Sequence, residues 1–385
     1  MISLATPVLT QSIGDARQRH LDYAERAGHI TMIIYSARAE GLRAVELSPR
    51  LTAIPTGSRS RFTFAWDAYR LGASVHRARP VDVITTQDPF AAGLAGLLLK
   101  RRFGIPLDVQ NHSTFIDNPY FLRERPVQNR LLNWLAKGVI RRADTHRVVN
   151  RREKAAYAVL GVDPARVQVI PVPINLAQFL NPIPAETLAG LRARLGLRPE
   201  HRVALWVGRP VTAKNLPMLF EAVDRARRAI PELRLVLVGD FSRAAPLRRQ
   251  AAALGETVVF AGPAAHEELP AYCALCSVYV HSSFYEGMPR VLVEAAAAGR
   301  PAVCPDIPGA DAAILDGETG FLTRPEDPGD LAEKLVRLLQ QPELAEAMGR
   351  RARAHALQAF DRDRHIDALV DAWRAAAALR NEGGR

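Results

Sequence analysis

The sequence has few of the features that mark secreted or membrane-spanning proteins. Three cysteines in 385 residues are too few for a disulfide framework. The longest uncharged apolar run, Ala91 to Leu99, is far shorter than the roughly 20 residues that cross a bilayer. The N-terminus lacks the basic start and the long apolar stretch of a signal peptide. We therefore expect a cytoplasmic protein. No GxGxxG follows the first expected strand, which argues against a nicotinamide-dependent enzyme.

The composition is that of a globular protein with more than one domain. Apolar residues make up 48% of the chain and charged residues 24%, a balance that supports real hydrophobic cores. A chain of 385 residues exceeds one ordinary domain, so two domains are expected. Short apolar strands alternate with helical stretches almost throughout, which is typical of parallel sheets built from βαβ units. The proline-bearing segment 171–184 looks like a linker.

These patterns predict an α/β protein with an N-terminal domain at residues 1–175 and a C-terminal domain at 176–362. A final helix at 363–385 is expected to cross back onto the first domain. In the first half, Leu131, Leu132, Leu135 and Val139 have core-facing spacing on an expected helix at 127–141. The expected strands lie at residues 2–5, 30–35, 51–54, 81–85, 107–109, 146–149 and 167–170, and then at 203–207, 233–238, 258–260, 278–282 and 301–304.

The positive charge is concentrated in the first half of the chain. Residues 1–181 contain 25 Lys and Arg against 14 Asp and Glu, whereas residues 182–385 contain 26 of each. This half should therefore meet an anionic partner such as a phospholipid surface, a lipid phosphate or nucleic acid. Nucleic acid is disfavoured, because no aromatic-basic interleaving accompanies the charge. The arginines from Arg123 to Arg152 offer a membrane-facing surface. The apolar residues of the helix expected at 127–141 are nevertheless expected to pack into the core rather than to face a membrane. An arginine-rich composition with no partner remains the alternative.

The stretch from Phe284 to Gly299 predicts a strand, a tight turn and a helix. Pro289 suits the first helical position, where its missing N–H would be unpaired in any case, and Gly299 suits the C-terminal stop. The start of such a helix attracts phosphate through its unpaired N–H groups and partial positive charge. Glu286 in the loop and Glu294 in the helix can then meet different ends of one ligand. A plain crossover with two solvated glutamates is the alternative.

A second loop adds two cations to the same half of the chain. The strand 203–207 runs into Gly208 and Arg209, and Lys214 and Asn215 follow before the next helix. Ligands of open α/β sheets bind above the carboxyl ends of the strands, where these residues are expected. A forked guanidinium and a movable ammonium together suit a diphosphate. The alternative is a basic loop with solvated side chains.

Residues 203–323 resemble the donor domain of the retaining glycosyltransferases of family four, which have the GT-B architecture. The first half resembles the family more loosely, through Asn111-His112-Ser113-Thr114 at a strand end. One departure is the loop after the first strand, where the family often has paired glycines and this chain has only Gly14. The matching pieces of the second half are Gly208-Arg209, Lys214-Asn215, Leu237-Val-Gly239, Val259-Phe-Ala-Gly262, Glu286-Gly-Met-Pro-Arg290 with Glu294, Gly299-Arg-Pro-Ala-Val303 and Gly317-Glu-Thr-Gly-Phe-Leu322.

The resemblance implies two Rossmann-like parallel-sheet domains that face a central cleft, and a role for each matching residue. Arg209 and Lys214 would hold the donor diphosphate and stabilise charge on the leaving group. Glu286 would bind hydroxyls of the donor sugar and Glu294 those of the ribose, while His112 would contact the sugar near the reacting carbon. The expected catalytic residues are thus His112, Arg209, Lys214 and Glu286, and the expected donor-binding residues are Gly14, Gly208, Asn215, Gly262, Gly287, Met288, Pro289, Arg290 and Glu294.

The function that follows is transfer of a hexosyl group from a nucleotide-diphosphate sugar to an acceptor hydroxyl, with retained anomeric configuration. The family implies front-face attack, in which the leaving phosphate takes the acceptor's proton, so no protein nucleophile is assigned. A glycan or lipid-linked acceptor is expected, in glycolipid or cell-surface polysaccharide synthesis, at the cytoplasmic face of the membrane. The rivals are a nucleotide-sugar epimerase or hydrolase of the same architecture, and a catalytically weak scaffold that binds nucleotide sugars or membranes.

Two further patterns suggest metal sites, and we discount both. Cys273 and Cys276 form a CxxC without a second pair, in a stretch that is expected to be helical. Asp361-Arg-Asp363 matches the metal motif of the other glycosyltransferase fold, but it precedes a helix and lies far from any expected strand end. We expect no cofactor and no catalytic metal.

Overall fold

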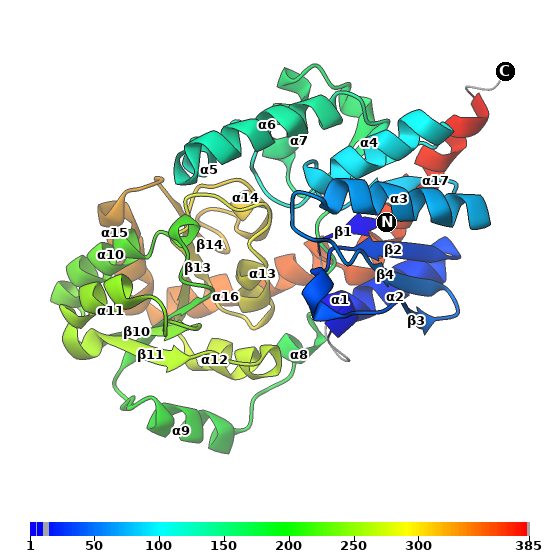
Figure 1. The fold of residues 1–385 in the computed structure, drawn as a ribbon. Coiled ribbons are helices and arrows are strands. Elements are labelled where there is room, and N and C mark those ends of the chain that lie inside the picture. The colour runs from blue at the N-terminus through cyan, green and yellow to red at the C-terminus, as the bar shows by residue number, and fades with distance from the viewer. Residues whose placement is uncertain (5, 11–14, 383–385) are drawn as a thin grey trace. The chain divides into compact units, whose positions relative to one another are not determined.

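The chain folds into two compact units, each built around its own sheet (Figure 1). The computed structural model describes residues 1–4, 6–10 and 15–382. Unit 1 comprises Met1–Ile174 and Arg362–Arg385, and unit 2 comprises Asn175–Asp361. The predicted α/β class with two parallel-sheet domains is confirmed.

Unit 1 contains an eight-stranded sheet in the order β3-β4-β2-β1-β5-β6-β7-β8. Neighbouring strands are parallel except for β3, which pairs with β4 in the antiparallel sense and forms one edge. The antiparallel edge strand was not predicted. The strands are β1 (Ile2–Ser3), β2 (Ile30–Ile34), β3 (Val45–Ser48), β4 (Leu51–Pro55), β5 (Ile84–Thr86), β6 (Leu107–Asn111), β7 (Thr145–Val148) and β8 (Val167–Val169).

Helices cover both faces of this sheet, because its strands bury apolar side chains on both sides. Along β2, Ile33 joins one hydrophobic core while Met32 and Ile34 join another, as the period-two geometry of a strand requires. The helices are α1 (Pro7–Thr10), α2 (Asp15–Ala27), α3 (Phe64–Ala78), α4 (Ala91–Phe103), α5 (Pro119–Glu124), α6 (Pro126–Ile140), α7 (Arg151–Val159) and α17 (Arg362–Glu382), with short 3-10 turns at Arg38–Glu40 and Pro164–Arg166.

Helix α17, the last in the chain, packs within unit 1. The ring of Trp373 makes an edge-to-face contact with Tyr23 of α2, with 5.5 Å between the centroids, and its indole Nε1 donates to Asp108 Oδ2 of β6 at 3.2 Å. Arg362 at the start of α17 pairs with Asp22 of α2. Ile366, Leu369 and the residues around them complete the core on this face of the sheet.

Unit 2 contains a six-stranded, all-parallel sheet in the order β11-β10-β9-β12-β13-β14. Its strands are β9 (Arg202–Val207), β10 (Leu233–Val238), β11 (Val258–Gly262), β12 (Val278–Val280), β13 (Ala302–Pro305) and β14 (Gly320–Thr323). Its helices are α8 (Ala177–Leu180), α9 (Ala185–Arg194), α10 (Leu216–Ala229), α11 (Ala245–Ala252), α12 (Leu269–Leu275), α13 (Arg290–Ala297), α14 (Ala310–Ala313), α15 (Pro328–Gln340) and α16 (Pro342–Ala359), with 3-10 turns at Thr212–Lys214, Gly255–Thr257 and His266–Glu268.

The order of the strands defines where a ligand of unit 2 should bind. From β9 the chain moves outward through β10 to β11, and it then returns to the other side of β9 for β12, β13 and β14. The direction of winding therefore reverses between β9 and β12. In open α/β sheets, ligands bind beyond the carboxyl ends of the strands at such a reversal.

Helix α6 corrects one prediction about the core. Val139 is buried as expected, but Leu132 and Leu135 are only half-buried and Leu131 is 63% exposed. The buried face instead carries Asn129, which donates to Phe121 O at 2.6 Å. It also carries Asn133, Ala136, Val139 and Ile140, and Asn133 donates to Asp117 Oδ1 at 2.9 Å. Because the amides are satisfied by neighbouring polar groups, the helix can bury them and turn part of its leucine stripe outward.

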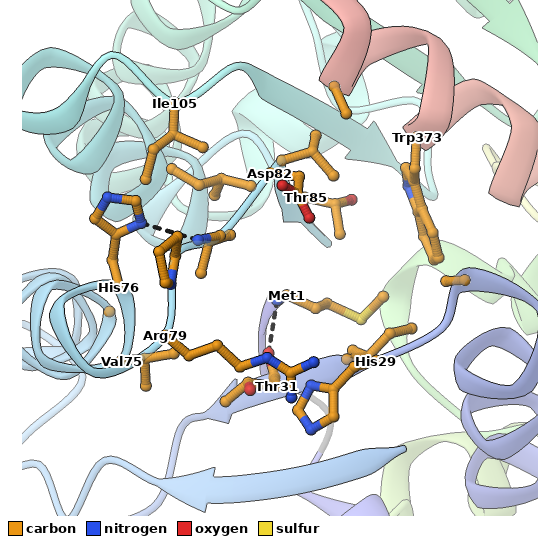
Figure 2. A pocket seen from close by; sticks show the side chains of 18 of the residues that line it. Met1, His29, Thr31, Val75, His76, Arg79, Asp82, Thr85, Ile105 and Trp373 are labelled. Carbon is orange, nitrogen blue, oxygen red and sulfur yellow. Dashed lines mark hydrogen bonds between the residues drawn. The ribbon is translucent and has the colours of Figure 1, made fainter. Parts of the chain in front are cut away.

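A cavity of about 520 Å³ lies at the amino-terminal edge of the unit 1 sheet, around the start of β1 and β2. Figure 2 shows Trp373 of α17 on one side of it and His76 of α3 on another. His76 Nδ1 accepts a hydrogen bond from Val81 N at 3.0 Å, which fixes that ring. His112 follows β6 at the carboxyl ends of the strands, which is the opposite edge of this sheet, so the cavity is not part of the candidate site.

Candidate active site

Two loops emerge side by side at the point where the unit 2 sheet reverses. Strand β9 ends at Val207 and continues into Gly208 and Arg209, and β12 ends at Val280 and continues into His281. The two strands are direct neighbours, with Ala204 paired to Val278 and Leu205 to Tyr279. The two loops singled out by sequence are thus brought together.

Hydrogen bonds fasten these two loops to each other. Ser282 Oγ donates to Lys214 O at 2.7 Å, and Phe284 N donates to Ala213 O at 2.9 Å. Asn215 has a left-handed backbone, with φ 45°, at the start of α10. Asparagine tolerates this conformation better than most residues, so it allows the chain to turn sharply from the 3-10 turn into the helix.

Lys214 and Glu286 form an ion pair in which each side chain is only 20% exposed. Ser283 Oγ also donates to Glu286 Oε1, at 3.0 Å, and His281 Nε2 lies 3.5 Å from the same oxygen. Burial raises the pKa of Glu286, but His281 and Lys214 outweigh it and bring this pKa to about 2. Burial lowers the pKa of His281. Glu286 is therefore an anion at neutral pH, and Lys214 is the cation that faces it.

Arg209 differs from Lys214 in its surroundings. Its side chain is exposed, and among the described residues none forms an ion pair with it. Gly208, which precedes it, lies close to Lys214, because a β-carbon at this glycine would be 3.7 Å from Lys214 Cε. One guanidinium open to solvent and one half-buried ammonium therefore flank the same loop. This is the arrangement expected to receive a diphosphate.

Glu294 lies one element further on, in α13, and is only 4% exposed. Its Oε1 lies 3.1 Å from His266 Nε2 and 3.6 Å from Arg290 Nη2. Gln178 Nε2 lies 2.8 Å from His266 Nδ1, and the ring of Phe179 packs edge-on against the imidazole at 5.8 Å. A buried carboxylate held by two basic side chains has a fixed orientation, as an acceptor for hydroxyl groups requires.

The turn before α13 differs by one residue from the prediction. Pro289 caps the helix, and Arg290 takes the first helical position. Gly287, Met288 and Pro289 are buried, and Gly309 packs directly against this turn: a β-carbon at Gly309 would lie 2.3 Å from Gly287 O. Gly309 also has a φ of 83°, which other residues rarely adopt.

Gly299, the expected helix stop, and Gly262, one of the expected donor-binding residues, both lie at the end of an element. Gly299 has a φ of 73° just beyond α13, and its N–H donates to Ala296 O, as a helix stop requires. Gly262 ends β11, and its carbonyl accepts from Gly239 N at 2.9 Å. Gly14 lies outside the described residues.

In unit 1, His112 directly follows β6, and Asn111 is the last residue of that strand rather than part of the loop. His112 Nδ1 lies 3.4 Å from Arg147 Nη1, and Nε2 is shielded from water without a hydrogen-bond partner among the described residues. Burial, and then the charge of Arg147, lower the pKa of His112 well below its ordinary value. The imidazole is therefore neutral at pH 7.

A buried carboxyl group lies beside this histidine loop. Asn111 Nδ2 donates to Glu153 Oε1 at 2.6 Å, and Asn150 caps α7 by accepting from Glu153 N at 2.8 Å. Burial raises the pKa of Glu153 to about 8. Most molecules therefore carry Glu153 as a neutral acid at pH 7.

Sequence reasoning missed His266, His281, Arg147 and Glu153. For His281 a signal existed, because it follows a strand end just as His112 does. Nothing comparable marked His266, whose contact with Glu294 joins residues 28 apart. Arg147 follows His146 on a short strand and Glu153 lies in a charged run at the start of α7, so only the fold shows what surrounds them.

The two discounted metal patterns can now be placed. Cys273 lies in α12 and Cys276 caps it, and both are buried. Asp363 lies in the first turn of α17 and pairs with Arg26. Among the described residues, no group of three His, Cys, Asp or Glu side chains could hold a metal ion. Within the same residues, no helix is long and apolar enough to span a bilayer.

Two family models match this chain. The model of the glycosyl transferases group 1 matches residues 190–355, and that of the glycosyl transferase 4-like domain matches residues 19–173. The D-inositol 3-phosphate glycosyltransferase of Streptomyces scabiei is 30% identical over 350 residues, which cover 88% of this chain and 75% of that protein. The chain therefore belongs to the group 1 glycosyltransferases.

Solved structures agree on the architecture. Sucrose-phosphate synthase from Thermosynechococcus elongatus has a TM-score of 0.81 at 24% identity, covering 98% of this chain and 99% of that one. Anabaena Alr3699/HepE in complex with UDP and glucose has a TM-score of 0.75 at 19% identity, covering 97% and 99%. The fold is that of the GT-B glycosyltransferases. The protein is a glycosyltransferase that transfers a sugar from a nucleotide sugar.

Proposed function

We propose that this enzyme transfers a hexosyl group from a nucleotide-diphosphate sugar to an acceptor hydroxyl with retention of configuration. The proposal rests mainly on the cluster at the carboxyl ends of β9 and β12, where the winding of the unit 2 sheet reverses. Arg209 and Lys214 lie on the loop after β9, and Glu286 lies on the loop after β12. The two cations suit the diphosphate and the carboxylate suits sugar hydroxyls. Developing negative charge on the leaving phosphate would be stabilised by groups that are already in place.

The remaining roles follow from the geometry of each side chain. Glu294, fixed by His266 and Arg290, would accept hydrogen bonds from the ribose hydroxyls. The buried backbone from Gly287 to Pro289 and the backbone of Arg290 would help to bind the donor sugar. Gly208, Asn215 and Gly262 would shape the donor loops, and Gly14 is proposed for the same role. The neutral His112 would donate a hydrogen bond to the sugar near the reacting carbon.

The chemistry needs no protein nucleophile in this proposal. The acceptor oxygen bonds to the anomeric carbon on the face that the leaving group departs from, the bond to the phosphate oxygen breaks, and that phosphate takes the acceptor's proton. Arg209 and Lys214 supply the positive charge that a divalent metal would otherwise bring, so we propose metal independence. Turnover should then persist in EDTA, and loss of turnover that magnesium restores would contradict this part.

UDP is the first nucleotide to test. Alr3699/HepE, which shares this fold, was crystallised with UDP and glucose. The experiment is incubation of the enzyme with UDP-hexoses and candidate acceptors, followed by NMR of the anomeric proton of the product. A new glycoside with the donor's configuration supports the proposal. An epimerised nucleotide sugar, or free hexose without any glycoside, would favour the epimerase or hydrolase reading.

The acceptor should be anionic or presented at an anionic surface, in glycolipid or cell-surface polysaccharide synthesis. Unit 1 contains 30 Lys and Arg against 18 Asp and Glu, whereas unit 2 contains 21 against 22. The similar enzyme from Streptomyces scabiei is named for a phosphorylated acceptor, D-inositol 3-phosphate. A phosphorylated polyol and a lipid phosphate share the chemistry that unit 1 would recognise.

We propose peripheral contact with the cytoplasmic face of a membrane through helix α6. Val127, Leu131 and Trp134 are 85%, 63% and 72% exposed, and their spacing of four and three places them on one stripe. Exposed Arg123, Arg125 and Arg130 lie close to this stripe in sequence. An apolar stripe with a tryptophan and a basic rim is typical of helices that lie in the membrane interface, and each basic residue near an anionic surface contributes about 1 kcal/mol.

Co-sedimentation tests this contact. Wild-type protein should bind vesicles that contain phosphatidylglycerol at low salt, and less at high salt. Trp134→Ser should weaken binding, while Leu357→Ser, which replaces a partly exposed leucine of unit 2, should not. Equal binding of both variants, or no binding by the wild type, would remove α6 from the account.

A further inference from the structure

One arginine of unit 1 is buried without an ion-pair partner among the described residues, although the carboxylate of Asp108 on β6 is near enough to raise its pKa. Arg147 lies on β7 and is 1% exposed. Its Nη1 donates to Gln110 Oε1 at 3.0 Å, its Nε to Ile170 O at 2.7 Å and its Nη2 to Pro171 O at 2.7 Å. Among the described residues none forms an ion pair with it, so neutral acceptors alone satisfy this guanidinium.

Such an arrangement is costly, and the charge nevertheless persists. Burial lowers the pKa of Arg147 to about 10, which still leaves a cation at neutral pH. A buried charge without a close counter-ion opposes folding unless its hydrogen bonds are well satisfied. Methionine or leucine would fill the same space without this cost, so packing alone does not explain an arginine here.

The remaining contact of Arg147 is with the histidine assigned to the reaction. Nη1 lies 3.4 Å from His112 Nδ1. Arginine can only donate hydrogen bonds, so Nδ1 must present its lone pair. A neutral imidazole with a lone pair on Nδ1 carries its proton on Nε2. That nitrogen is shielded from water and has no partner among the described residues.

The same guanidinium also holds the backbone that leads out of the unit. Ile170 and Pro171 follow β8, and the first segment of unit 1 ends at Ile174, after which the chain continues into unit 2. Two hydrogen bonds of 2.7 Å, from Nε and Nη2 to these carbonyls, hold the guanidinium in place. Gln110 fixes it from β6 and in turn donates to Thr85 Oγ1 at 2.9 Å. The orientation of Arg147 is therefore set by β6 and by the segment that follows β8.

We propose that Arg147 is a positioning residue that holds His112 as a neutral imidazole with its proton on Nε2, aimed as a hydrogen-bond donor. That the Nε2–H of His112 is used in the reaction rests on the proposed function, whereas the assignment of the tautomer does not. The other groups that face His112 are Arg19 and His20 of α2. Burial lowers the pKa of His20 to about 4, so His20 is neutral and Arg147 and Arg19 are the charges that oppose protonation of His112.

Nitrogen-15 NMR of histidine-labelled protein tests the tautomer directly. His112→Gln identifies the resonances, because they disappear in that variant. In the wild type, Nδ1 should have the shift of an unprotonated nitrogen and Nε2 that of a protonated one, across pH 6 to 8. In Arg147→Met the Nδ1-protonated form should become populated and His112 should begin to titrate as the pH falls toward 6.

Two further variants keep the test decisive if Arg147→Met folds poorly. Arg147→Lys retains the charge and one donor, so it should retain more of the Nε2–H form. Arg166→Gln is the matched control, since Arg166 also donates to backbone carbonyls, those of Ala143 and Asp144, and within the described part of the chain forms no hydrogen bond with His112. A protonated Nδ1 in the wild type, or an unchanged tautomer in both Arg147 variants, would overturn the proposal.

Kinetics separate this role from a merely structural one. Arg147→Met should lower kcat by roughly 10- to 100-fold, the usual effect of misplacing a catalytic group, and leave the KM for the donor unchanged. The kcat profile should also gain a fall toward acidic pH that Arg166→Gln lacks. If wild-type protein shows the expected tautomer but no transfer, the proposed function fails and the positioning by Arg147 stands. A rise in donor KM with unchanged kcat would contradict the positioning role.

Discussion

Replacing Lys214 with methionine is the most informative perturbation of the donor site. The change removes the cation and keeps an unbranched side chain that is one heavy atom shorter, so Glu286 loses its partner in an ion pair where both side chains are only 20% exposed. Breaking a fully buried pair costs about 3–5 kcal/mol. Ser283 and His281 still contact Glu286, and the pair keeps some contact with water. We therefore expect a smaller loss of local stability than for a fully buried pair, about 2–3 kcal/mol.

The catalytic effect should be larger than the effect on stability. Loss of one preorganised group that stabilises developing charge lowers kcat by roughly 10²- to 10³-fold. The pKa of Glu286, now about 2, should rise in the variant, because Lys214 is one of the groups that lower it. Turnover with a nucleotide sugar measures the change in kcat, and hydrogen exchange in β9 and β12 measures the change in local stability.

Lys334→Met is the matched control for this experiment. Lys334 is another half-buried lysine of unit 2, and its Nζ lies 3.3 Å from Asp330 on α15. Its hydrogen bonds and ion pair are with Leu322 and Asp330, which are not among the residues proposed for the donor site, so its loss should leave kcat within about threefold of the wild type. The reasoning is refuted if Lys214→Met and Lys334→Met have the same turnover and the same donor affinity.

Three more predictions concern single residues. Glu153→Gln should raise the melting temperature at pH 8 and not at pH 5. The pKa of Glu153 is about 8 in the folded state and near 4.3 in the unfolded state, so the wild type loses stability as the pH rises from the lower value to the higher, whereas the neutral amide does not titrate and still accepts from Asn111. An equal shift in melting temperature at both pH values would contradict this. Gly309→Ala should reduce donor binding, because its β-carbon would lie 2.3 Å from Gly287 O, and calorimetry that finds normal affinity would show that the turn can move. Glu294→Ala should raise the donor KM about 10- to 100-fold with a smaller change in kcat, since it removes charged hydrogen bonds worth about 1.5–3 kcal/mol; an unchanged KM would remove Glu294 from the donor site.

The meeting of the two loops proposed as the donor site was predictable, because their residues lie in short, local patterns. Arg209 and Lys214 follow one strand, and Glu286 follows another after a β-rich run. The carboxyl ends of parallel strands share one edge, so the two loops can be expected to meet as soon as the strands are recognised. The ion pair between Lys214 and Glu286 is the direct consequence.

The rest depends on contacts between residues far apart in the sequence. Nothing in the pattern of β7 shows that Arg147 reaches His112, 35 positions earlier, or that it binds the carbonyls of Ile170 and Pro171. The periodicity of α6 was misleading for a related reason. Asn129 and Asn133 can be buried only because Phe121 and Asp117 offer hydrogen-bonding partners, and a count of apolar residues does not include such partners.

We propose that a nucleotide sugar binds at the strand ends where the unit 2 sheet reverses. Isothermal titration of UDP, GDP and ADP in EDTA tests it most directly, with wild-type protein, Arg209→Ala and His112→Ala. We expect one nucleotide to bind the wild type without metal, Arg209→Ala to abolish or strongly weaken this binding, and His112→Ala to leave it intact. Binding of equal strength to the wild type and Arg209→Ala, or no binding of any of the three, would contradict it.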